Sequence, residues 1–173
     1  NGLKDGHTFH YDENNKMTQE LIFNSGLKNG IFLEFNANHD TMRIGHYELG
    51  KQDSTWTRFY ENGQIASTIS YSGDSMHGKF ILYHQNGQIE TKGEHLDGKQ
   101  HGRWDFYDNK GLWITGGEFN NGVVVDNRLT TDPTNNKPPD GTSKYRITKD
   151  PIKNKPLDST YKYNTYANGQ IKN

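Results

Sequence analysis

Glycine and aromatic positions recur with a period of 24 residues over residues 1–125 of the chain. One repeat position is glycine at Gly2, Gly26, Gly50, Gly98 and Gly122, with Gly73 one place before its expected position. Nine places later every repeat carries an aromatic residue: Tyr11, Phe35, Phe59, Tyr83 and Tyr107. No window sustains helical spacing, because Gly or Asn interrupts each one. The pattern predicts an all-β chain of about five repeats, near residues 2–25, 26–49, 50–72, 73–97 and 98–121.

Turn signals divide each repeat into two strands. Asn62-Gly63 and Asn86-Gly87 each lie between two short β-prone runs, which is the strongest local signal for a hairpin. We expect a type I′ turn at both sites, with positive φ at the asparagine and at the glycine.

The strands are predicted from alternating side chains. The first strand of the third repeat is expected from about Thr55 to Tyr60, and that of the fourth from Lys79 to Tyr83. The return strand, Gln64 to Tyr71, places its apolar residues at even offsets and hence on one face. Gly93 and Gly117 replace the isoleucine of that face in the next two repeats, which leaves room for a neighbouring ring to lie flat.

These motifs resemble a known repeat family. The stretch from Gly98 to Trp104 has the form Gly-x-x-x-Gly-x-aromatic, and Asn-Gly-Gln-Ile follows the next aromatic residue in the third and fourth repeats. Both features are similar to the MORN-repeat variant of bacterial proteins, over about residues 1–125. The resemblance implies a single-sheet solenoid of antiparallel β-hairpins, with no catalytic residues common to the family. It also implies a scaffold or interaction module, with lipid contacts or an antitoxin role in some members.

Composition narrows the class of protein. The 173 residues include 29% hydrophobic residues and no cysteine, and the formal charge is −1. Disulfides and thiolate metal sites are therefore excluded, and a charge near zero argues against nucleic-acid binding. No apolar run reaches the ~18 residues of a transmembrane helix. A polar, Asn-rich, cysteine-free chain that begins with Asn1 favours a processed or truncated bacterial protein in the periplasm or at the outer membrane, with the cytoplasm as the alternative.

The last third of the chain departs from the repeat pattern. All five prolines lie between residues 133 and 156, and proline lacks the N–H donor of a central strand, so residues 126–158 are expected to be a linker or extended arm. The net charge changes from −5 over residues 1–125 (11 basic, 16 acidic) to +4 over residues 126–173 (9 basic, 5 acidic). Residues 145–148 suffice for one strand, and residues 159–173 are predicted to be a partial further repeat.

The repeat spacing argues against the common catalytic and metal sites. His77 and His101 share one repeat position, as do Glu94 and Glu118, but equivalent residues of neighbouring hairpins lie ~10 Å apart. Zinc ligands lie ~2.0–2.3 Å from one metal, and paired catalytic carboxylates must act on one bond. No Gly-x-Ser-x-Gly elbow, P-loop or dinucleotide motif occurs. The sequence predicts no catalytic residue, cofactor or metal, and it predicts that the glycines of Gly-x-x-x-Gly lie in turns.

Aromatic and β-branched residues are the remaining candidates for binding. Four rings at one repeat position are expected to pack inside the thin sheet: Phe32, Trp56, Phe80 and Trp104. Trp113 stands where other repeats carry Met, Thr or Ile and is a candidate partner anchor. The run from Glu118 to Val125 is predicted to end the fifth repeat as an edge strand that can accept another strand. The further binding candidates are Val123, Val124 and Val125 in that strand and Tyr145, Tyr163 and Tyr166 in the tail.

Three functions remain open. The favoured one is a non-enzymatic protein–protein interaction module or scaffold subunit of a larger assembly in a bacterial envelope, with another protein as its partner. The second is a lipid- or glycan-surface binder with basic residues between aromatic rows, for which the charge of −5 is unfavourable toward anionic headgroups. The third is an antitoxin-like inhibitor of a toxin enzyme, which the family resemblance alone suggests.

Overall fold

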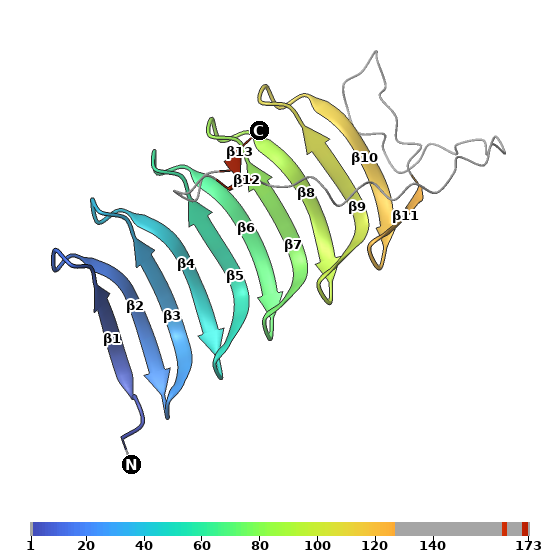
Figure 1. The fold of residues 1–173 in the computed structure, drawn as a ribbon. Coiled ribbons are helices and arrows are strands. Elements are labelled where there is room, and N and C mark those ends of the chain that lie inside the picture. The colour runs from blue at the N-terminus through green and yellow to red at the C-terminus, as the bar shows by residue number, and fades with distance from the viewer. Residues whose placement is uncertain (1, 127–163, 166–170, 173) are drawn as a thin grey trace, which may run out of the picture. The chain divides into compact units, whose positions relative to one another are not determined.

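A computed structural model describes residues 2–126, 164–165 and 171–172, and the chain divides into two compact units, Asn1–Asp140 and Gly141–Asn173. The first unit contains one sheet of eleven strands, each antiparallel to the next and arranged in sequence order (Figure 1). The strands are β1 (Gly6–Tyr11), β2 (Met17–Asn24), β3 (Leu27–Phe35), β4 (Thr41–Glu48), β5 (Lys51–Phe59), β6 (Ile65–Ser72), β7 (Ser75–Tyr83), β8 (Ile89–Leu96), β9 (Lys99–Tyr107), β10 (Trp113–Asn120) and β11 (Val123–Asp126). In the second unit, β12 (Asn164–Thr165) pairs with β13 (Ile171–Lys172). The predicted all-β single-sheet solenoid is confirmed.

Each repeat contributes one hairpin, from β1–β2 in the first repeat to β9–β10 in the fifth. One expected strand is divided. The run from Glu118 to Val125 is not a single strand, because a tight turn at Asn121-Gly122 separates the end of β10 from β11. The sheet therefore ends one strand beyond the fifth hairpin.

Tight two-residue turns join consecutive repeats. Both central residues have positive φ in all five, for example 51° at Ser25 and 84° at Gly26, which is the pattern of a type I′ turn. The second residue of each turn donates its N–H to a carbonyl 22 residues earlier, as Gly26 does to Lys4 and Gly98 does to Met76, each at 2.8 Å. These backbone bonds link every repeat to the next along one edge of the hairpins.

The loops at the opposite edge differ from the expected turn type. Gly63 and Gly87 have φ of 80° and 83° as predicted, but Asn62 and Asn86 are not among the described residues with positive φ. The N–H of Gly63 donates to the carbonyl of Tyr60, and the N–H of Tyr60 to that of Gln64, so the loop is a type I turn followed by a glycine bulge. The type I′ prediction was wrong here because the side chain of Asn62 accepts the N–H of Gln64 at 3.1 Å and leaves positive φ to the glycine alone.

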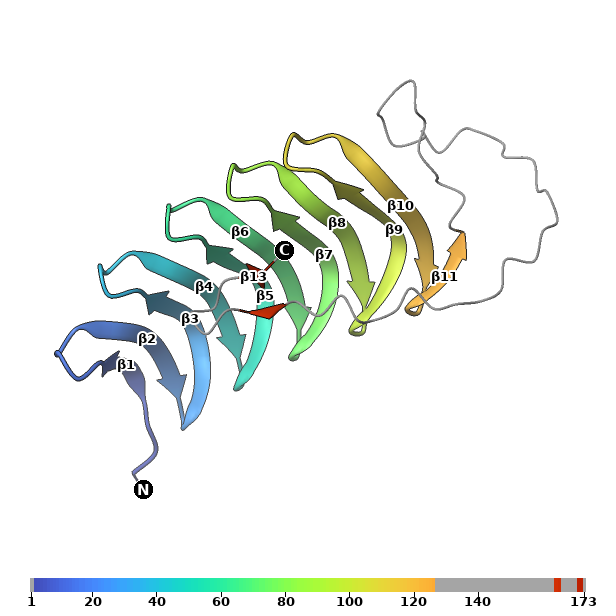
Figure 2. The ribbon, with the colours of Figure 1, turned by 45° about the horizontal axis from the view of Figure 1, so that its top comes forward.

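The first strands of the repeats begin earlier than predicted. β5 begins at Lys51 rather than Thr55, and β7 at Ser75 rather than Lys79. The second glycine of Gly-x-x-x-Gly, predicted to be a turn residue, lies inside a strand, as Gly78 does with φ of 94°. At the equivalent point of β3, Leu21 pairs with Phe32 and Phe23 with Lys28, so three residues oppose Ile22. Such bulges bend a sheet, and Figures 1 and 2 show that each hairpin is curved.

Most of the core lies on one face of the sheet, which we call the ring face because it carries Phe32, Trp56, Phe80 and Trp104. Leu21, Phe32, Trp56 and Trp104 are only 2–4% exposed. A Cβ on Gly93 would lie 2.3 Å from the indole of Trp104, so the ring occupies the space that the glycine was predicted to leave. Gly45 accommodates Trp56 in the same way, with a Cβ-to-ring distance of 2.2 Å.

Candidate functional site

The aromatic residues of the ring face form two similar clusters, 48 residues apart in sequence. Phe32 and Trp56 have centroids 5.3 Å apart at 32°, and Phe80 and Trp104 have centroids 5.2 Å apart at 38°. The third ring of each cluster meets the indole edge-on, Tyr47 in the first and His95 in the second. The rings pack against one another on one face of a single-layer sheet. This packing supports the structural role that the sequence predicts for them.

The two clusters differ in the side chains beside them. The first has Glu34, Arg43 and Arg58, where the second has Leu82, Thr91 and Phe106. These six belong to one unbroken cross-strand row of the ring face, in which Glu34 pairs with Arg43 and Arg43 with Arg58. The guanidinium of Arg43 lies 5.1 Å from the ring centroids of both Phe32 and Trp56, and its Nε is 3.5 Å from Glu34.

Two lysines add to the positive charge of this face. The ammonium of Lys4 lies 5.2 Å from the ring of Phe23, and that of Lys28 lies 4.7 Å from the ring of Tyr47. We call Lys4, Lys28, Arg43 and Arg58 the cationic strip. All four belong to the first three repeats.

The opposite face of the sheet is apolar in the first two repeats. Six exposed side chains make up what we call the apolar patch, with the exposed fraction of each: Leu3 66%, Phe9 44%, Leu27 49%, Ile31 53%, Ile44 38% and Leu49 70%. Cross-strand pairing makes it continuous, because Phe9 pairs with Glu20, Glu20 with Leu33, and Leu33 with Ile44. The carboxylate of Glu20 in this row is bonded to His7 at 2.9 Å.

Later repeats carry small, polar or charged residues at nearly all the equivalent positions. Ile31 corresponds to Thr55, Lys79 and Arg103, and Ile44 corresponds to Thr68, Lys92 and Gly116. Leu27 corresponds to Lys51, Ser75 and Lys99, whereas Ile81 is an exception at the position of Phe9 and Leu33. Because all five repeats share one backbone, the exposed apolar residues are not needed for the repeat fold. Sequence reading missed this patch, although a comparison of outward positions between repeats would have found it.

The valines predicted to form an accepting edge lie in the last strand. Val123 and Val125 are 64% and 59% exposed, and among described residues β11 pairs only with β10. Val124 is half-buried and lies opposite Phe119. Val125 occupies the position of Asp5 and Asn29, whose side chains accept an N–H from the next tight turn. A valine side chain cannot accept an N–H, so the side-chain bond that Asp5 and Asn29 make to the following tight turn cannot form at Val125.

Trp113 is not exposed. Its indole is 4% exposed and donates through Nε1 to Asp105 at 3.0 Å. The Asp105 carboxylate is also held by Arg103, with Nη2 2.9 Å from Oδ1, and Lys92 lies 3.9 Å away. Trp113 therefore satisfies a buried carboxylate on the face opposite the rings. The burial of Trp113 does not support the predicted role as a partner anchor, which stays a prediction. The other candidates Tyr145, Tyr163 and Tyr166 lie outside the described residues.

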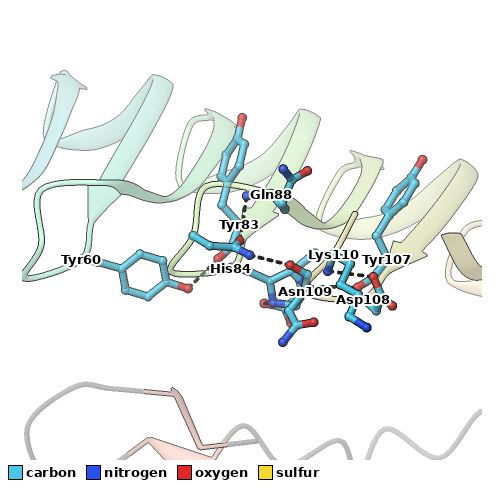
Figure 3. Close-up of polar contacts among 10 residues, drawn as sticks. Tyr60, Tyr83, His84, Gln88, Tyr107, Asp108, Asn109 and Lys110 are labelled. Atoms are coloured by element: carbon cyan, nitrogen blue, oxygen red, sulfur yellow. Dashed lines mark hydrogen bonds and ion pairs between the residues drawn. The ribbon is translucent and has the colours of Figure 1, made fainter. Parts of the chain in front are cut away.

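Polar side chains join the later loops to one another. Tyr60 donates its hydroxyl to the carbonyl of Tyr83, and His84 bonds through Nε2 to the carbonyl of Tyr107 at 3.1 Å (Figure 3). Burial and the nearby carboxylate of Glu90 raise the pKa of the Tyr60 phenol, and Arg58 partly opposes them. The loops of the first and fifth repeats instead begin with Asp12 and Asp108, which accept N–H groups of their own loop. These contacts hold the hairpins in register.

The described residues contain no group of three or more His, Cys, Asp or Glu side chains placed to hold a metal ion. His77 lies beside Asp97, with Nδ1 3.2 Å from Oδ1. A hollow of about 380 Å³ lies between the first two loops, and Lys16, at its wall, donates to the carbonyl of Ala37 at 2.9 Å. The described part of the chain contains no helix long and apolar enough to cross a membrane.

The fold is that of a single-layer β-hairpin repeat protein. Residues 4–25, 52–72 and 76–97 match the family model described as the MORN repeat variant. The first, third and fourth hairpins are therefore MORN-type repeats, which are typically modules that contact proteins or membranes. The second and fifth hairpins have the same pairing without being matched.

Two solved structures share part of this fold at low sequence identity. No curated protein sequence matches the chain. A structure of the S. aureus TarM G117R mutant, in complex with Fondaparinux, alpha-GlcNAc-glycerol and UDP, is 11% identical with a TM-score of 0.38, over 56% of this chain and 19% of that one. The Glycosylation Associate Protein (Gap123) complex from Streptococcus agalactiae is 14% identical with a TM-score of 0.36, over 65% of this chain and 21% of that one. The chain thus spans about a fifth of either, and these similarities carry no functional argument.

Proposed function

We propose that the chain is a non-enzymatic interaction module that binds another protein through the apolar patch of its first two repeats. The observation that carries the proposal is the contrast between repeats: Leu27, Ile31 and Ile44 are exposed, and later repeats replace them with polar, charged or small residues. Exposed apolar patches of several hundred Å² on a soluble protein mark interaction sites. Glu20, which lies within the patch, is already paired with His7, so its carboxylate needs no partner from the bound protein.

The size of the patch fits such an interface. Six large apolar side chains that are each 38–70% exposed together present several hundred Å² of apolar surface. A stable interface buries about 800 Å² on each partner, of which a polar rim is part. The module would act as a scaffold subunit of a larger assembly, for which we propose a place in a bacterial envelope.

The test uses a variant that the repeat fold itself supplies. Ile31→Lys with Ile44→Lys gives the second repeat the residues that the fourth carries as Lys79 and Lys92, so folding should be retained. The matched control, Thr55→Lys with Thr68→Lys, adds the same charge at the same positions of the third repeat. We expect one protein to co-purify from the native source with the wild type and the control but not with the patch variant. Equal recovery with all three would overturn the proposal, and sedimentation would show whether the lost partner is a second copy.

A further inference from the structure

Positive charge on the ring face is concentrated at one end of an otherwise acidic sheet. Residues 1–125 carry a net charge of −5, yet the described ring face has four basic side chains, those of the cationic strip. Two carboxylates lie on this side: Glu34, beside Arg43, and Glu90, which lies 3.9 Å from Nδ1 of His84 at the loop edge. Glu20, Glu94 and Asp105 instead pair with Leu33, Lys79 and Lys92 on the opposite face.

Arginines facing each other across a strand pair are unfavourable by themselves. Arg43 and Arg58 are direct cross-strand partners on β4 and β5, and like charges in this position repel. Glu34 lies beside the pair, with its Oε2 3.5 Å from Nε of Arg43. The guanidinium of Arg43 lies over the rings of Phe32 and Trp56, 5.1 Å from each centroid, and the Arg43 side chain is 38% exposed. A planar, partly exposed guanidinium can donate two parallel hydrogen bonds to one carboxylate, which is the bidentate geometry.

The same cross-strand row becomes apolar in the next repeats. Beyond Arg58 it continues through Ser67, Leu82, Thr91 and Phe106, and Phe106 is half-buried. A ligand that follows the row therefore meets cations first and a partly exposed ring ~20 Å further on, at ~5 Å per strand. A protein segment carries both carboxylates and apolar side chains, whereas a phosphate polymer or a lipid headgroup carries only the charge.

We propose that the cationic strip and the adjoining row form a binding site for an acidic segment of a partner protein. Carboxylates of the segment pair with Arg43 and Arg58, with Lys4 and Lys28 nearby, and an apolar residue of the segment packs on Phe106. At ~3.3 Å per extended residue, about six residues separate the acidic from the apolar contact. This inference goes beyond the proposed function, because it assigns a second site on the face opposite the apolar patch.

The test measures binding of three probes to the full chain by calorimetry. The first is a synthetic peptide of four glutamates followed, six residues later, by phenylalanine. The second replaces the phenylalanine with glycine, and the third is inorganic polyphosphate. We expect the first to bind most tightly, and Arg43→Gln with Arg58→Gln to weaken it at least tenfold. The control is Lys99→Gln with Lys110→Gln, which removes two basic side chains outside the strip and should change binding less than twofold.

Tryptophan signals locate the site independently. The chain has three tryptophans, so its indole N–H resonances can be assigned one by one. The first probe should shift the resonance of Trp56, which lies under Arg43, and leave that of Trp113, on the opposite face, unchanged. Equal weakening by both double variants, tightest binding of polyphosphate, or no binding of the first peptide would each overturn the inference. None of these outcomes touches the apolar patch, so the proposed function would stand or fall by its own test.

Discussion

At the scale of single residues, glycine decides where a ring can lie. Gly45 and Gly93 are ordinary strand residues whose φ is not positive, and each is covered by an indole from the next strand. Gly63 and Gly87 have a different role, because each adopts the positive φ that its exposed loop requires. Two kinds of glycine therefore recur in one repeat, and substitutions at them should fail for different reasons.

Gly93→Ala should destabilise the sheet by overpacking. Its Cβ would lie 2.3 Å from the indole of Trp104, so the ring must move within a filled cluster, at a cost of about 1–3 kcal/mol. Gly63→Ala is the comparison, since its Cβ meets nothing within 4 Å and only backbone strain remains. Thermal unfolding should show a larger fall in Tm for Gly93→Ala, and a Gly93→Ala, Trp104→Phe double variant should recover part of it. Equal falls for the two alanine variants would contradict this packing.

Gly87→Val should also lower Tm, through the backbone. Gly87 has φ of 83°, which a β-branched residue adopts with strain of about 1–3 kcal/mol. Gln85→Val, two residues earlier at an exposed position, should have a clearly smaller effect. If both substitutions lower Tm equally, the left-handed conformation assigned to Gly87 is wrong.

His95 should make stability depend on pH. Burial among the rings lowers the pKa of its imidazole from the ordinary 6.5. Below about pH 6.5 the imidazole of the unfolded chain binds a proton that the folded chain does not yet bind. The free energy of unfolding therefore decreases as the pH falls from about 6.5 to the lower pKa of the folded state. His95→Tyr places at this position the residue that two other repeats carry as Tyr47 and Tyr71. Denaturant unfolding between pH 7.5 and 5 should show a smaller loss for the variant, and identical slopes would refute the assignment.

At the scale of elements, the hairpins could be predicted from sequence and the details of their turns could not. The 24-residue period fixed the hairpin units and the position of the aromatic residues, because each ring must fall on the same face in every repeat. The turn type was missed, because Asn-Gly suits both a two-residue turn and a three-residue loop with a glycine bulge. The bulge at Gly78 was missed for a similar reason, since a glycine with positive φ can lie in a turn or within a strand.

The binding surfaces were harder to anticipate for a different physical reason. A sheet residue faces one side or the other according to register, and a single bulge exchanges the two faces. The row that contains Arg43 and Arg58 is visible only once the pairing across β4 and β5 is known. Trp113 was considered as an anchor because it differs from its equivalents, but that difference matches the buried Asp105 at the neighbouring position.

The bonds between loops should contribute measurably to the later repeats. Tyr60→Phe removes the hydroxyl that donates to the carbonyl of Tyr83, which should cost about 0.5–1.5 kcal/mol. Tyr11→Phe is the control, because Tyr11 is 55% exposed in the first repeat. Urea unfolding should show a lower midpoint for Tyr60→Phe at an unchanged m-value. Equal midpoints for the two variants would mean that the loop contact adds nothing to stability.

At the scale of the whole sheet, the number of strands limits how copies can associate. Eleven antiparallel strands are an odd number, so β1 and β11 run in the same direction. A second copy that keeps its ring face on the same side can then continue the antiparallel pattern only by pairing like edge with like edge. The β1 edge is flanked by charged residues, among them Lys4, Asp5 and Asp12, which discourage such pairing. The β11 edge presents valines instead.

A fragment of residues 1–126 should therefore self-associate through β11. Its outer backbone groups have no partner in the fragment, and antiparallel pairing about Val124 would place Val123 beside Val125 of the other copy, a favourable β-branched pair. Because like edges pair, we expect a closed dimer in sedimentation velocity experiments. Val125→Lys in the same fragment should restore the monomer, since a charged side chain at an edge opposes strand addition. A monomeric fragment with the stability of the full chain would show that this edge needs no cover and that the tail has another role.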